Sequence, residues 1–304
     1  MGELTHRGGN RAVRARVQAA MRIRVLTSLS LALAAALSAA PASGAQPLTI
    51  RHPTSATAVI ARVSTSGGFV PVQVNLRSLP SFTLYGDGTV VVPAPVIQTF
   101  PGPAISPLVR SRLSEQQVQA LLRRARDAGL LARGAIGYGD MGAVGVSDMP
   151  TTTLILNATG RHVRHSAYAL GATPRSRRLS PAQARARRAL ARFIAQLPQG
   201  PAGQPYTPRA IAVYVAPFAG KGRPRDRVRW PLASNLASAG RRPSAGFPYR
   251  CITVRGAAVP TLLATLRRAT EQSQWIARPG AARTFQVVAR PLLPDQRECA
   301  AVGA

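Results

Sequence analysis

Residues 82–92 read FTLYGDGTVVV, in which two runs of β-forming residues flank Gly86-Asp87-Gly88. Glycine and aspartate tolerate the positive φ angles that tight turns need, so this pattern predicts an antiparallel β-hairpin. We therefore interpret Asp87 as a turn residue. The apolar run at 58–63 predicts a further strand before the hairpin. Prolines between positions 93 and 107 predict a stiff, extended connection after it.

Two segments carry the same signature of a helix start. Ser114 is followed three residues later by Gln117, and Ser180 by Gln183. This spacing matches the capping box, in which the serine and the glutamine satisfy backbone N–H groups of the first turn. Apolar residues then recur at helical spacing, and Gly129 predicts the end of the first helix. Both segments are predicted to pack an apolar stripe against a sheet.

The order of these elements predicts two modules. The first, residues 57–198, runs hairpin, helix, hairpin, helix, and its second hairpin is formed by 151–158 and 161–168. Residues 199–208 are rich in proline and glycine and predict a linker. The second, smaller module, residues 209–304, has expected strands at 210–216, 251–255 and 284–289 and an expected helix at 260–272. We therefore expect an α+β fold, with two modules of antiparallel hairpins and strands and with helices packed on one sheet face.

The amino-terminal region carries the pattern of an export signal. A cationic start at Met21 precedes residues 25–40, which are mostly apolar and uncharged. That length is short for a membrane span and typical of a secretory signal, and small residues offer cleavage after Ala42 or Ala45. We expect residues 1–45 to be a leader and signal peptide, with the start at Met1 or Met21 left open. The protein is then secreted or envelope-associated, with no transmembrane helix after signal removal.

Export determines how the two cysteines are interpreted. After signal removal, residues 46–56 would form a flexible terminus of the mature chain. The exported protein would fold in an oxidising compartment. Cys251 and Cys299 are the only cysteines, so we expect them to form a disulfide within the second module. Closing a loop of about 50 residues would stabilise the fold by about 4 kcal/mol in the chain-entropy model. A metal site is disfavoured because neither cysteine has a Cys or His at ligand spacing.

The chain resembles a group of exported proteins in four segments. These are FTLYGDGTVVV, LSEQQVQALLRRARDAGLL, TTTLILNATG and RPLLPDQREC. In them the chain is similar to uncharacterised exported proteins of high-GC Gram-positive bacteria, over roughly residues 57–170 and 250–299. The resemblance implies an extracellular location and carries no catalytic residues with it.

The charge of the chain predicts attraction to polyanions. Its formal net charge is +30, and 39 of its 40 basic residues are arginine. The heavy use of Ala, Gly and Pro beside Arg indicates that part of this excess is compositional background. Residues 220–250 hold eight basic residues against one acidic residue, with aromatic residues interleaved. The candidate polyanion contacts are Arg223, Arg225, Arg227, Arg229, Trp230, Arg241 and Arg242; the alternative is a solvated arginine-rich loop.

The usual catalytic and cofactor patterns are not met. His162 and His165 are three positions apart on an expected strand, so their side chains point to opposite faces and cannot chelate one ion without a bulge. The G-x-G-x-x-G match at 137–142 follows a helix and leads into a strand, which is the reverse of the dinucleotide-binding context. We predict no catalytic residue, no cofactor and no metal.

A second candidate site lies in the glycine-rich segment 133–150, which holds Asp140 and Asp148. Structureless loops of this length within a domain are often functional. Our leading hypothesis is a non-enzymatic envelope or extracellular binding protein for an anionic cell-wall polymer, lipid headgroups or an acidic protein. The alternative is an extracellular enzyme or protease inhibitor acting through residues 133–150. Nucleic acid is disfavoured as a partner because export removes the protein from the chromosome.

Overall fold

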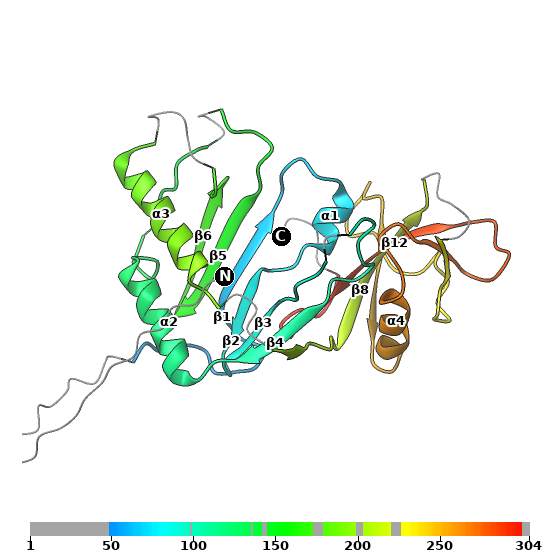
Figure 1. Cartoon of the computed structure of the whole chain (residues 1–304), viewed down its shortest axis with the longest axis horizontal. Coiled ribbons are helices and arrows are strands. Elements are labelled where there is room, and N and C mark those ends of the chain that lie inside the picture. Colours follow the sequence, from blue (N-terminus) through cyan, green and yellow to red (C-terminus); the bar gives the residue numbers. More distant parts are fainter. Residues whose placement is uncertain are drawn as a thin grey trace, which may run out of the picture. The chain divides into compact units, whose positions relative to one another are not determined.

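The described residues form two sheets and four helices, which confirms the expected α+β fold (Figure 1). The computed structural model describes residues 49–97, 99–134, 136–141, 145–172, 179–198, 203–219 and 226–299. The expected signal peptide at 1–45 lies outside these residues. Within the described ranges, the helices all fall short of the length and apolar character that crossing a membrane requires.

The first sheet has seven strands in the order β6-β5-β1-β2-β3-β4-β7, and all neighbours in it are antiparallel. Its strands are β1 (Val59–Ser66), β2 (Phe82–Tyr85), β3 (Thr89–Pro93), β4 (Leu108–Arg112), β5 (Thr151–Ala158), β6 (Arg161–Tyr168) and β7 (Gln204–Pro205). Both predicted hairpins are present. In the β2–β3 turn Gly88 has a φ of 83° and donates its N–H to the carbonyl of Tyr85 at 3.0 Å. Glycine fits this turn because it adopts positive φ without steric cost.

Helices α2 (Glu115–Asp127) and α3 (Pro181–Ala195) cover one face of this sheet (Figure 1). Both begin with the predicted capping box, at Ser114 and Ser180. The buried residues of α2 include Leu121 and Leu122, which pack with Leu190 and Phe193 of α3 and with the inner face of β1 and β5. The apolar stripes therefore form one core between the helices and the sheet.

The second sheet has five strands in the order β10-β8-β12-β11-β9, and only the β9–β11 pair in it is parallel. Its strands are β8 (Ala210–Pro217), β9 (Arg227–Arg229), β10 (Arg250–Arg255), β11 (Gln274–Ile276) and β12 (Phe285–Pro291). Helix α4 (Ala258–Leu266) packs on one face, where Trp275 is fully buried. Helix α1 (Val72–Arg77) packs Leu76 on the other face, so this sheet is buried on both sides.

Several side-chain contacts connect the two sheets. Asp295, after β12, accepts hydrogen bonds from Arg62 of β1 at 2.6 Å and from the Tyr85 hydroxyl of β2 at 2.8 Å. Arg77 of α1 pairs with Glu271, whose other carboxylate oxygen accepts the backbone N–H of Gly102 at 3.1 Å. The division of the chain into two modules stays a prediction. Of the expected linker, residues 199–202 lie outside the described ranges and Gln204–Pro205 forms β7.

The amino-terminal segment differs from the flexible terminus that we expected at 46–56. Residues 46–48 lie outside the described part of the chain. Ile50 is buried, and its backbone exchanges two hydrogen bonds with the side-chain amide of Gln119, at 2.8 and 2.9 Å. The sequence pattern missed this contact because an isolated isoleucine gives no periodic signal. Ile50 is therefore attached to α2.

Candidate functional site

The candidate arginines of residues 220–250 are divided between the two edges of the five-stranded sheet. Arg227 and Arg229 belong to β9 at one edge, whereas Arg241 exchanges two backbone hydrogen bonds with Cys251 of β10 at the other edge. Arg223 and Arg225 lie outside the described residues. The sequence suggested one basic loop, but the fold places its described arginines in two sites.

The first site is an open hollow of about 850 Å³ between β9 and the end of α4, which we call the β9 hollow. Residues two apart on a strand share a face, so Arg227 and Arg229 project on the same side. Arg268 joins them from the turn after α4. Sequence reasoning missed Arg268 because basic residues are common after a helix, where they interact favourably with the carbonyl end. The lining is completed by Val228, Trp230, Pro231, Leu232, Ala233, Thr265 and Ala277.

Trp230 does not take the role that the sequence suggested. Its side chain is buried at 3% exposure, and its Nε1–H donates to the Ser234 hydroxyl at 3.1 Å. The ring packs edge-on against Trp275 with centroids 5.9 Å apart. A ring held in this way is not free to stack on a ligand, so the proposal of Trp230 as a direct contact is corrected. Trp230 instead supports the floor of the β9 hollow.

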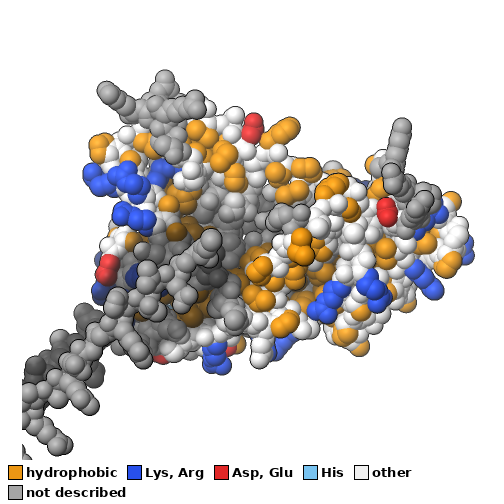
Figure 2. Space-filling view, viewed as in Figure 1, with side chains coloured by type: hydrophobic (Ala, Val, Ile, Leu, Met, Phe, Trp, Pro, Cys, Tyr) orange, Lys and Arg blue, Asp and Glu red, His pale blue; other side chains and the backbone are white. Residues whose placement is uncertain are grey.

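The arginines of the β9 hollow take part in none of the ion pairs found in the described part of the chain. Arg227, Arg229 and Arg268 are exposed, and the ion pairs of the described residues all lie elsewhere. The exposed Asp226 precedes β9 in the chain. Figure 2 shows basic side chains gathered beside the position of α4, with few acidic ones among them. Such a hollow attracts anions, and guanidinium groups can bind carboxylate or phosphate oxygens in pairs.

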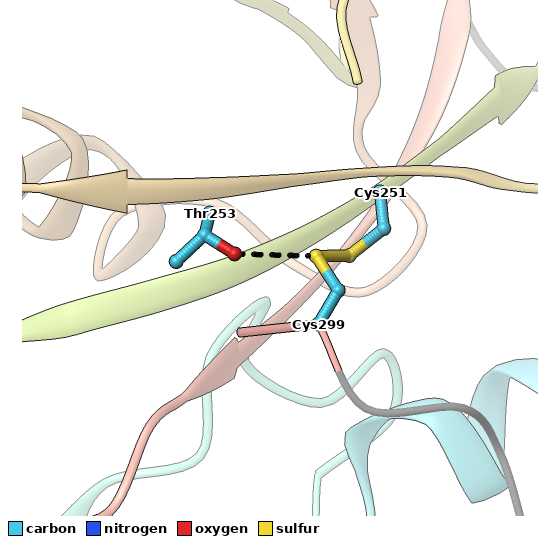
Figure 3. The surroundings of a disulfide bond; sticks show 3 residues. All are labelled: Cys251, Thr253 and Cys299. Atoms are coloured by element: carbon cyan, nitrogen blue, oxygen red, sulfur yellow. Dashed lines mark hydrogen bonds between the residues drawn. A yellow bond between two sulfur atoms is a disulfide. The ribbon is translucent and has the colours of Figure 1, made fainter. Parts of the chain in front are cut away.

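The second site is a hollow of about 350 Å³ next to the disulfide, which we call the disulfide hollow. The expected bond between Cys251 and Cys299 is present, and the hydroxyl of Thr253 lies 3.4 Å from the Cys299 sulfur (Figure 3). The disulfide attaches the end of the described chain to β10. The hollow is lined by Gly240, Arg241, Arg242, Pro243, Cys251, Ile252, Thr253, Arg255, Glu298 and Cys299.

A third hollow, of about 700 Å³, lies at the turn between β5 and β6. Three of its four basic side chains are already bonded within the protein. Arg161 donates to the Leu131 carbonyl at 2.7 Å, His162 contacts the Asn157 amide oxygen at 2.7 Å, and His52 contacts Glu115 at 3.1 Å. These side chains hold local structure, so this hollow is a weaker candidate for anion binding than the β9 hollow.

The segment 133–150 is attached to the fold on both sides of Asp140. Tyr138 and Met141 are buried, and the Tyr138 carbonyl accepts a hydrogen bond from Arg187 at 3.2 Å. Asp148 is exposed, with its carbonyl accepting the N–H of Phe69 at 3.4 Å. Asp140 is also exposed, while residues 135 and 142–144 lie outside the described ranges. The proposal that Asp140 and Asp148 form a site stays a prediction.

The two histidines of β6 point to opposite faces, as their spacing predicted. His162 is exposed, whereas His165 is buried between the Tyr138 hydroxyl, 2.8 Å from Nδ1, and the Leu130 carbonyl, 2.9 Å from Nε2. Because a carbonyl only accepts, this arrangement suits the neutral tautomer that carries its proton on Nε2 and accepts from Tyr138 at Nδ1. Burial raises the pKa of Tyr138 to about 12, which keeps this donor protonated. No group of three or more His, Cys, Asp or Glu among the described residues is placed to hold a metal ion.

Comparisons of the chain with protein-family models, with curated proteins and with solved structures found no match. The functional interpretation therefore depends on the geometry and charge of the sites described above.

Proposed function

We propose that this protein is a secreted, envelope-associated binding protein that holds an anionic polymer in the β9 hollow without chemical conversion. The observation that supports this function is the group of three exposed arginines, Arg227, Arg229 and Arg268, with no ion pair among the described residues. The anionic cell-wall polymer is the favoured ligand. Lipid headgroups and an acidic protein are the competing ligands that the experiment separates.

Arginine suits this function for physical reasons. Its guanidinium group keeps its charge at every physiological pH, and its planar fork matches the oxygens of carboxylates and phosphates. Arg227 and Arg229 belong to a strand paired with β11, and Arg268 follows a packed helix, so the backbone that carries these side chains needs little further ordering on binding.

Two observations support the extracellular location. The first is the signal pattern at residues 21–45, with its cationic start, apolar stretch and small residues. The second is the disulfide between Cys251 and Cys299, since structural disulfides are stable in oxidising compartments and rare in the cytosol.

The test is cosedimentation of residues 46–304 with envelope fractions over a series of salt concentrations. The variant R227Q/R229Q/R268Q removes the arginines of the β9 hollow. The control R185Q/R188Q/R192Q removes the same charge from exposed positions on α3. We expect binding to weaken with salt, and the hollow variant to lose about tenfold in affinity, which is about 1.4 kcal/mol. The control variant should bind like the wild-type protein.

An equal loss in both variants would contradict the β9 hollow as the site and would assign binding to the total charge. Extracting lipids or digesting proteins in the envelope fraction identifies the ligand class. Binding that survives both treatments supports a polymer, whereas binding lost with the lipid or the protein would assign the ligand to that class instead.

A further inference from the structure

The two arginine hollows lie on opposite edges of one sheet, and this placement suggests more than a single binding event. We infer that the protein is bivalent: the β9 hollow and the disulfide hollow each hold a segment of anionic polymer, so that one molecule can bridge two polymer segments. This inference rests on the proposed function, which requires only the β9 hollow.

The strand order sets the distance between the two sheet edges on which the hollows lie. β9 and β10 are the first and last strands of the five-stranded sheet, with β11, β12 and β8 between them. Neighbouring strands are spaced by about 4.8 Å, so the two edges are about 19 Å apart. A short anion cannot span that distance. A long polymer can occupy both hollows or can leave one free for a second chain.

The disulfide hollow has the chemistry of an anion site with lower affinity. Arg241, Arg242 and Arg255 line it and are exposed, and Arg242 already donates one guanidinium N–H to the Phe247 carbonyl, which also weakens this site. The hydroxyl of Thr253 adds a hydrogen-bonding group. Glu298 also lines it and would repel an anion, so the formal charge of the lining is more weakly positive than that of the β9 hollow. Removing the Glu298 charge should therefore tighten binding here, which a merely structural role of this surface would not produce.

The backbone that carries the arginines of the disulfide hollow is held in place by several contacts. Arg255 is the last residue of β10. The backbones of Arg241 and Cys251 exchange two hydrogen bonds in an isolated antiparallel β-bridge. Arg242 donates to the Phe247 carbonyl, and Arg250 donates to the carbonyls of Ser238 and Gly240. Glu298 and Cys299 also line the hollow, and the disulfide between Cys251 and Cys299 holds them beside β10. Because one sheet holds the backbone of both sites, the second contact can be made without further ordering of the backbone.

A short probe counts the sites. Tripolyphosphate is titrated calorimetrically into residues 46–304 at physiological salt, where bulk charge is screened. We expect two equivalents for the wild-type protein and for the control R185Q/R188Q/R192Q. The variants R227Q/R229Q/R268Q and R241Q/R242Q/R255Q should each bind one equivalent. E298Q should keep two equivalents and tighten the weaker one by about threefold, because one repulsive charge is removed.

A long probe tests bridging. Two bead populations, one of them fluorescent, carry long-chain polyphosphate, and wild-type protein should join them into mixed aggregates. Each triple variant of a hollow should bind single beads without joining them. Joining that persists in both triple variants would overturn the inference and would assign bridging to self-association of the protein.

The outcomes separate this inference from the proposed function. Salt-dependent binding to envelope with fewer than two equivalents of tripolyphosphate overturns bivalence and leaves the proposed function in place. If the wild-type protein does not bind the envelope fraction, both the proposed function and the bivalence are overturned. Two equivalents retained by R241Q/R242Q/R255Q would also overturn bivalence, because the second site would then lie elsewhere.

Discussion

Single buried side chains determine how the loops of this protein are held. Arg187 of α3 is buried at 5% exposure and donates to three backbone carbonyls, those of Tyr138, Tyr168 and Ala169. Burial lowers the pKa of the Arg187 guanidinium, but an arginine side chain stays charged at neutral pH. This residue connects α3, the end of β6 and the segment 133–150.

Replacing Arg187 with methionine should destabilise the protein. The change keeps most of the apolar stem but leaves three carbonyls without their donor, so we expect the free energy of unfolding to fall by about 2–4 kcal/mol. Chemical denaturation measures this loss. The control R188M changes an exposed neighbour on the same helix and should stay within about 0.5 kcal/mol of wild type. Equal stability of the two variants would show that the carbonyls find other partners.

Residue roles were the hardest part of the site to predict from sequence. Helical periodicity identified Leu190 and Phe193 as core residues, but Arg187 lies beside that stripe, and arginine is seldom buried, so nothing marked it as a buried residue. In the same way Trp230 lies among arginines in the chain, although its ring packs against Trp275 in the core. Burial of these side chains depends on partners that are distant in sequence, which local patterns do not contain.

Secondary structure elements were predictable where their signals are local. The capping boxes of α2 and α3 and the hairpins β2–β3 and β5–β6 each depend on residues a few positions apart, and all of them are present. β9 and β11 were missed because each has three residues and they pair in parallel across a long connection. As a result, the sequence did not show that β9 and β10 form opposite edges of one sheet.

The capping box of α2 should contribute measurably to stability. Ser114 accepts the backbone N–H of Gln117 at 3.3 Å, and the Gln117 side chain accepts the Ser114 N–H at 2.8 Å. Replacing Ser114 with alanine removes one acceptor at the helix start, so we expect a loss of about 1 kcal/mol in the free energy of unfolding. Q116A changes an exposed residue of the same turn and serves as the control. A loss no larger than that of Q116A would contradict a stabilising cap.

At the scale of the whole molecule, a partly buried carboxylate connects the two sheets. Asp295 bonds to Arg62 and Tyr85, which are 233 and 210 residues away in the chain. Local sequence patterns cannot reveal contacts between residues so far apart, so the sequence analysis predicted the two modules but not the contacts that join them. Burial by itself would raise the pKa of Asp295, but the hydrogen bonds and charge of Arg62 and the hydroxyl of Tyr85 outweigh it and lower the pKa below the ordinary value of 3.8.

This lowered pKa predicts how stability depends on pH. A carboxyl group with a lower pKa in the folded state stabilises that state above its ordinary pKa, and the contribution is lost as the pH falls through the folded value. We expect D295N to lower the free energy of unfolding by about 2–3 kcal/mol at pH 7, because Arg62 loses its charged partner. The difference between wild type and D295N should then shrink as the pH falls below 3.8. Urea denaturation at a series of pH values measures it, with E298Q as the exposed control. A difference that stays constant down to pH values well below 3.8 would show that the Asp295 charge does not stabilise the contact between the sheets.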